Sequence, residues 1–245
     1  MNGVLTILRR ELAGLFYSPL AWILLCVGLF LVGWDFTTTI EEARGDVVFG
    51  LNWAAGGGTL YWGVMVFLPP LLTMRMISEE ARTGMLEFLQ TAPVTDFAVV
   101  LGKFCAAWIF MSLFWSALLV YAATIHALGV DPDWGAVIGS YLGAVSVSAL
   151  FCAIGLLCSA TTSTPLLAAF FGIVANIVAV QLPRLASLPN VQWLKWGSGQ
   201  VDLVTSLQRG YLAGVLDSQV VVFFCAWTAL FLFLSIRAVE ARRWR

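Results

Sequence analysis

Six stretches of this sequence are apolar over the length that a helix needs to cross a lipid bilayer, about 20 residues. They lie near residues 19–39, 59–77, 99–127, 135–158, 164–183 and 219–238. Inside lipid the backbone polar groups must be paired within the protein, which restricts a spanning segment to a helix or to a strand of a closed barrel. The short alternating segments typical of barrel strands are absent from the sequence. The six runs therefore predict an all-α integral membrane protein with six transmembrane helices, in a single domain of residues 1–245.

The charge content agrees with this interpretation and narrows the classes of partner. Charged residues make up 11% of the chain and hydrophobic residues 60%, whereas soluble domains contain about 25% charged residues. Because the net charge is −1, nothing indicates a nucleic-acid partner. Membrane lipid is the expected surrounding.

The lysines and arginines predict the orientation of the chain. With the N-terminus placed inside, nine basic residues fall on the inner side and four on the outer side. Cytoplasmic loops carry such an excess of positive charge. We therefore expect a multi-pass protein of the bacterial cytoplasmic (inner) membrane with both termini in the cytoplasm. The inner set is Arg9, Arg10, Arg75, Arg82, Lys103, Arg237, Arg242, Arg243 and Arg245, and the outer set is Arg44, Arg184, Lys195 and Arg209.

The first 18 residues differ from a spanning segment. Leu5, Leu8, Leu12 and Leu15 recur at helical spacing, with charged residues between them. This pattern is typical of a helix that lies in the membrane interface, here an N-terminal elbow helix over residues 1–18. A frayed tail is the alternative interpretation.

Two outer segments, residues 40–58 and 184–218, are too short for folded external domains, and we expect short amphipathic helices there. In the second segment Leu203, Leu207, Tyr211 and Val215 share one helical face. In the fourth run, Gly139 and Gly143 form a small-xxx-small pair, which favours close packing between helices.

A polar insert over residues 78–93 separates the second and third runs. Ser78 is a good N-cap, Glu79 and Glu80 fall in the first turn, and Pro93 ends the segment. These features predict a short amphipathic helix at the inner membrane surface. It is either a docking surface for a cytoplasmic partner or a loop that is solvated or lies on the membrane.

No pattern of catalytic or cofactor-binding residues is present. The chain has one histidine, its five cysteines lie inside apolar runs without metal-ligand spacing, and no Walker phosphate-binding loop occurs. We expect no catalytic residue, no metal site and no bound cofactor. No charged residue lies mid-span, so Asn176 and Gln181 are the best polar candidates for a transport pathway, with hydrogen bonding between helices as the alternative.

The insert and its flanks contain, in order, Thr73-Met74-Arg75-Met76, Glu79-Glu80, Arg82-Thr83-Gly84, Glu87, Leu89, Pro93 and Gly102-Lys103. This pattern resembles the first cytoplasmic loop of type-2 ABC transporter permeases. Residues 131–143 and the C-terminal part, residues 206–245, resemble the gliding-motility-associated (GldF-like) branch of that family. Permeases of nitrous-oxide reductase maturation look similar.

The resemblance implies a type-2 ABC exporter permease fold, with two permeases joined to two cytoplasmic ATPase subunits that hold ATP and magnesium. It also implies that residues 78–93 are the coupling helix that docks on the ATPase, and that Ser159 to Pro165 form a second inner loop. The chain itself would then not be an enzyme. The residues that match the family's coupling motif are Glu79, Glu80, Arg82, Gly84, Glu87 and Pro93.

The function expected from this resemblance is export or mechanical work across the inner membrane, of the gliding-motility type. The second permease is another copy or a paralogue, and a partner with an extracytoplasmic domain would supply the outer domain that this chain lacks. The alternatives are a permease of metalloenzyme maturation, a secondary transporter, and a membrane scaffold.

Overall fold

The computed structural model describes residues 2–43, 47–84, 95–186, 203–204, 207, 211 and 217–242. Every regular element in these ranges is a helix, which confirms the all-α prediction. The elements are α1 (Asn2–Tyr17), α2 (Pro19–Glu42), α3 (Val47–Asn52), the π-helical turn η1 (Trp53–Gly57), α4 (Thr59–Thr73), α5 (Ser78–Thr83), α7 (Asp96–Trp115), α8 (Ala117–Ala127), α9 (Trp134–Thr161), α10 (Pro165–Ala186) and α13 (Ser218–Arg242).

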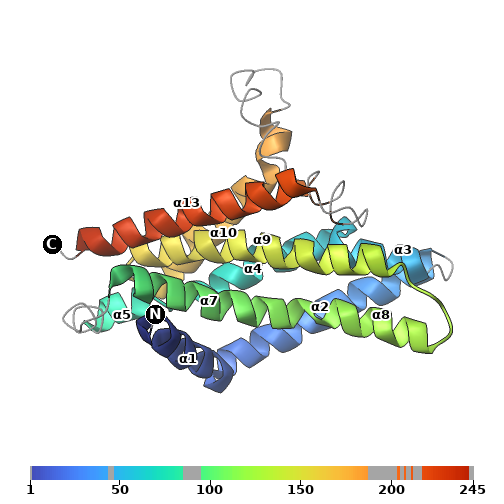
Figure 1. Ribbon diagram of the computed structural model, residues 1–245, viewed down its shortest axis with the longest axis horizontal. Coiled ribbons are helices and arrows are strands. Elements are labelled where there is room, and N and C mark those ends of the chain that lie inside the picture. Colours follow the sequence, from blue (N-terminus) through green and yellow to red (C-terminus); the bar gives the residue numbers. More distant parts are fainter. Residues whose placement is uncertain are drawn as a thin grey trace.

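The long helices lie side by side in an elongated bundle (Figure 1). Both chain termini and α5 lie at the same end, which we call the terminal end. Helix α9 packs against α4, α7, α10 and α13, and its small residues allow this close contact. Ser140, Ala144 and Ser148 are fully buried, and a side chain at Gly143 would meet Leu207 and Tyr211. The predicted pair Gly139 and Gly143 is therefore buried, with Gly143 against two residues of the second outer segment.

Five helical segments in the described ranges are long and apolar enough to cross a membrane. Helix α10 contains a shorter apolar segment, Pro165–Gln181, among its described side chains, so a sixth crossing stays a prediction. Few residues of α2 and α13 are buried, 17% and 11% of their most apolar stretches, which suits a lipid environment and not water. The five segments are Pro19–Glu42, Thr59–Thr83, Asp96–Ala127, Trp134–Thr161 and Ser218–Arg242.

Helix α1 packs along α7 and turns into α2 at Ser18, where Pro19 occupies the first turn of α2. Ile7 faces the bundle and is 6% exposed, whereas Leu5 is 49% exposed. Gly102 of α7 permits the close contact, because a Cβ atom there would lie 2.8 Å from Cγ2 of Ile7. A helix is therefore present over the first residues, and its position in a membrane interface stays a prediction.

Helix α4 runs through two prolines near its C-terminal end. Pro70 has no N–H to donate to the carbonyl of Val66, four residues earlier. The side chain of Asn176, from α10, supplies a donor instead, with Nδ2 3.3 Å from that carbonyl oxygen. Thr73 donates to the carbonyl of Pro69 at 2.9 Å. The carbonyl group freed by Pro70 is thus paired inside the bundle.

The structure places short helical elements, α3 and η1, over most of the first outer segment. In the second segment Leu203, Leu207 and Tyr211 are buried, while Val215 lies outside the described residues. The predicted third span consists of two helices, α7 and α8, that meet at Ser116. Thr95 caps α7, its Oγ1 accepting from the N–H of Ala98 at 3.3 Å.

Candidate functional site

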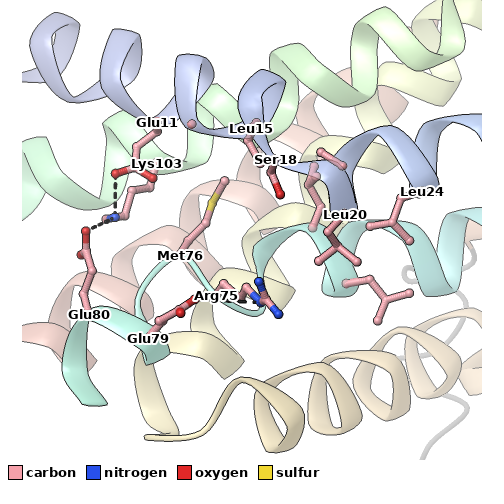
Figure 2. A pocket seen from close by; sticks show the side chains of 14 residues that line it. Glu11, Leu15, Ser18, Leu20, Leu24, Arg75, Met76, Glu79, Glu80 and Lys103 are labelled. Carbon is pink, nitrogen blue, oxygen red and sulfur yellow. Dashed lines mark hydrogen bonds and ion pairs between the residues drawn. The ribbon is translucent and has the colours of Figure 1, made fainter. Parts of the chain in front are cut away.

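A buried lysine lies at the terminal end of the bundle. Lys103, in the second turn of α7, has a side chain that is 1% exposed. Its Nζ atom lies 2.9 Å from Oε1 of Glu11 and 2.9 Å from Oε1 of Glu80 (Figure 2). A buried ammonium group is costly unless it is paired and hydrogen-bonded. The lysine therefore joins three elements, because Glu11 belongs to α1 and Glu80 to α5.

Arg10 completes the arrangement from the solvent side. One guanidinium nitrogen lies 2.8 Å from Oε1 of Glu11 and 2.8 Å from Oε1 of Glu80. The four side chains, Arg10, Glu11, Glu80 and Lys103, form what we call the terminal ion network. It contains two positive and two negative groups, so its net charge is zero.

The network changes the acidity of Glu11. Burial on its own would raise the pKa of this carboxyl, but the charges and hydrogen bonds of Lys103 and Arg10 outweigh burial and lower the pKa. Glu11 is therefore held as a carboxylate. The other oxygen of Glu80, Oε2, is buried and has no hydrogen-bond partner.

A second set of contacts holds the start of α5. Ser159, at the end of α9, is fully buried. Its Oγ accepts hydrogen bonds from the N–H groups of Ile77 at 3.1 Å and Ser78 at 3.0 Å, and donates to the carbonyl of Met74 at 3.0 Å. Ser159 thus satisfies the free N–H groups at the N-terminus of a helix from a different element.

The prediction that Ser78 is the N-cap of this helix is wrong. The N-cap position is Ile77, which makes no side-chain capping bond, and Ser78 is the first helical residue. The Ser78 hydroxyl donates to the carbonyl of Met74 in the preceding turn. Its side chain is therefore directed into the protein, where Ser159 already provides the acceptor that a cap would supply.

The end of α9 is fixed in turn by α13. Arg242 donates from Nε to the carbonyl of Ala160 at 2.7 Å and from a terminal nitrogen to the carbonyl of Thr162 at 2.8 Å. A cation at the C-terminus of a helix is favourable for the unpaired carbonyl groups there. The short connection between α9 and α10, residues 162–164, is positioned by this contact.

With this geometry established, the comparisons with known proteins identify the family. Residues 47–198, more than half of the chain, match the model of the ABC-2 family transporter proteins. The chain belongs to this family. No curated protein matches the chain. The matched region contains Glu80, Lys103 and Ser159, while α1 and α13 lie outside it.

ABC-2 family proteins are the membrane subunits of ABC transporters and work with a cytoplasmic ATPase. For this ABC-2 permease, the predicted assignment to the type-2 ABC permeases is therefore confirmed at the level of the family. Nothing in the described parts of the chain gathers three or more His, Cys, Asp or Glu side chains in a way that could hold a metal ion.

The predicted coupling residues of the permease fall into three groups. Glu80 is turned inward onto the terminal ion network. Glu79 is half-exposed and lies 3.9 Å from Arg75, while Arg82 and Gly84 are exposed. Glu87 and Pro93 lie outside the described residues. The described helix ends at Thr83, where Gly84 adopts a left-handed conformation with φ of 74°.

The two pathway candidates lie away from this site, on α10. Asn176 is fully buried and holds the carbonyl of Val66, as described above. Gln181 is partly buried. The structure thus provides the interhelical hydrogen bond that was the alternative interpretation for Asn176, and a role of either residue in transport stays a prediction.

A cleft of about 330 Å³ lies beside the network. Figure 2 shows Glu79 and Glu80 on one side of it, Arg75 near its middle, and Leu20 and Leu24 on the other. Sequence reasoning missed the contacts of Ser159 and Arg242 and the burial of Lys103. The only signal for them was that each is a polar residue next to an apolar run.

Proposed function

We propose that this chain is the permease subunit of an ATP-driven transporter, and that a separate cytoplasmic ATPase docks on the terminal end around α5 and residues 162–164. The observation that carries the proposal is the anchoring of α5. Its Glu80 is bound to α1 and α7 through the terminal ion network, and its first turn is held by Ser159 of α9. A force on α5 would therefore reach three other helices.

The length of α5 explains why such anchors are needed. The described helix has six residues, and isolated helices shorter than about 12–15 residues are marginal in water. Without Ser159 and the network, α5 would not hold one position. With them, it is a rigid extension of the bundle that a partner can push.

The exposed residues at the tip of α5 are the candidates for direct contact with the ATPase. Arg82 and Gly84 are exposed, and Glu79 is half-exposed. We assign Glu80 the task of positioning α5 within this chain. Glu87 and Pro93 are proposed as contact residues from the resemblance of their segment to the family's coupling motif.

The assembly we propose has two permeases and two ATPase subunits, with ATP and magnesium bound by the ATPases. Helix α10 would make the sixth membrane crossing, which suits the position of both termini at one end (Figure 1). The termini would face the cytoplasm, in keeping with the excess of basic residues on that side. The exposed apolar surfaces of α2 and α13 leave room for a second permease, either another copy or a paralogue.

The work performed is proposed to be export or mechanical action of the gliding-motility type, with an extracytoplasmic domain supplied by a partner. This finer assignment depends on the resemblance of residues 131–143 and of the C-terminal part to that branch. The chain's similarity to permeases of metalloenzyme maturation makes that role the second candidate.

The test is to co-express the full chain with a candidate ABC ATPase from the same organism, to purify the two together, and to measure ATP hydrolysis with and without the permease. We expect a stable complex and a hydrolysis rate that depends on the permease. Normal cellular function with an ATPase whose ATP site is inactivated would contradict the proposal. So would flux driven by an ion gradient through the purified chain alone.

A further inference from the structure

Two adjoining cavities follow the line of contact between α2 and α4. The first is the cleft of about 330 Å³ beside the terminal ion network. The second is a groove of about 310 Å³ nearer the middle of the bundle. Leu24 and Leu71 line both, so the cleft continues into the groove. The groove is lined by Leu24, Val27, Gly28, Leu31, Leu60, Gly63, Val64, Phe67, Leu68 and Leu71.

The polarity of the two cavities matches that of a lipid molecule, which has a polar headgroup at one end and apolar acyl chains at the other. The cleft has charged residues, among them Arg75, Glu79 and Glu80, whereas every residue lining the groove is apolar. The groove opens sideways, since Val27 is 52% exposed and Phe67 50% exposed. In a bilayer the polar headgroups lie at the ends of the spanning helices and the acyl chains between them. The cleft therefore lies where headgroups are, and the groove where acyl chains are.

The charges in the cleft favour one type of headgroup. Oε2 of Glu80 is a buried acceptor without a partner, because its other oxygen is the one that Lys103 and Arg10 contact. Glu79 offers a second carboxylate nearby. A primary ammonium group has three N–H donors and suits both acceptors. Arg75 is half-exposed, and its guanidinium group suits a phosphate.

We propose that the cleft and groove together bind one bilayer phospholipid with a primary-amine headgroup. The phosphate lies at Arg75, the ammonium group lies between Glu79 and Oε2 of Glu80, and an acyl chain occupies the groove between α2 and α4. Each cavity falls near the lower end of the range of about 300–1,000 Å³ for ligand sites. The proposal depends on the membrane location of the permease, and not on its ATPase.

The experiment measures lipid retention by the full chain, purified in detergent, with native mass spectrometry. The probes are phosphatidylethanolamine, phosphatidylcholine and phosphatidylglycerol with identical acyl chains. We expect phosphatidylethanolamine to bind about tenfold more tightly than the other two, the ratio that corresponds to one charge-assisted hydrogen bond. Phosphatidylcholine keeps a positive charge but has no N–H to donate, and phosphatidylglycerol keeps the phosphate without the amine.

Variants locate the lipid within the site. Gly63 lines the groove, and a Cβ atom added there would meet nothing within 4 Å, so Gly63→Leu is chosen to place bulk in the groove. It should abolish tight retention of phosphatidylethanolamine. The control, Ala123→Leu, adds similar apolar bulk at an exposed position of α8 and should leave retention unchanged. Arg75→Gln should weaken phosphatidylethanolamine and phosphatidylglycerol alike, and Glu79→Gln should remove the preference for the amine.

Three outcomes would overturn the proposal. Equal retention of phosphatidylethanolamine and phosphatidylcholine would remove the role of the amine. Unchanged retention in Gly63→Leu, with the variant still monodisperse, would place the lipid elsewhere. Disulfide crosslinking between two chains that carry cysteine at position 63 in place of glycine would show that a second copy covers the groove. Glu79 of α5 takes part in both proposals, but the retention measurements use the chain without its ATPase and Gly63 lies on α4, so the two proposals can fail separately.

Discussion

At the scale of single residues, Lys103 shows what the sequence did and did not reveal. Its position near the start of an apolar run indicates a basic residue on the cytoplasmic side of the membrane, because basic residues are more frequent on that side. Its burial depends on Glu11, 92 residues earlier, and on Glu80 in another helix. Such a partnership is created by packing between distant elements and leaves no local pattern, so it could not be predicted.

Removing the ammonium group should be costly, because it leaves two carboxylates close together and facing only Arg10. Lys103→Met is expected to destabilise the protein by about 3–5 kcal/mol, the usual cost of breaking a buried ion pair. Thermal unfolding in detergent measures this. Combining Lys103→Met with Glu11→Gln and Glu80→Gln should restore most of the loss, since no buried carboxylate is then left without its ammonium partner and the Arg10 side chain, 51% exposed, is solvated. If Lys103→Met alone were as stable as the native chain, the network would have no structural role.

The same network predicts a pH dependence. The folded state lowers the pKa of Glu11 below its usual 4.5, so the network's contribution is complete above pH 4.5 and is lost as the pH falls through the folded pKa. The melting temperature should therefore fall on acidification below that pH. Glu11→Gln should reduce the acid-side slope, whereas the control Glu42→Gln, at an exposed position of α2, should keep it.

At the scale of elements, the apolar runs were readable because a bilayer imposes a length and a composition on each span. A helix lies over each of the six runs. The start of α5 was harder to predict, because its cap comes from outside the segment. Ser78 has the composition of an N-cap, but the donors at that end are satisfied by Ser159, 81 residues away. Local propensity identified the helix, and a contact from α9 determined which residue caps it.

Ser159→Ala should leave the N–H groups of Ile77 and Ser78 buried without an acceptor. The expected cost is about 1–3 kcal/mol. Hydrogen exchange should speed up over residues 77–83 while exchange in the middle of α9 stays slow. Ser163→Ala, in the exposed connection after α9, is the matched control and should change neither. Unaltered exchange at residues 77–83 would mean that α5 is held by the ion network alone.

At the scale of the whole molecule, the α5 tip is the part that the proposed ATPase would contact. Arg82 is exposed and takes no part in the terminal ion network. We expect Arg82→Glu to lower permease-dependent ATP hydrolysis about tenfold, equivalent to about 1.4 kcal/mol of interface energy, with the melting temperature unchanged. Arg9→Glu, an exposed position on α1, should leave the rate intact. An equal effect of both changes would point to general electrostatic attraction instead of docking on α5.

The shared position of the two chain ends, visible in Figure 1, has a practical consequence. With both termini in the cytoplasm, as proposed above, a linker outside the bilayer could join the last residue of one copy to the first residue of another, producing a covalent tandem without an added crossing. In such a fused pair only one half need carry an inactivating substitution. The activity of that hybrid would reveal whether one intact half is sufficient for a working transporter.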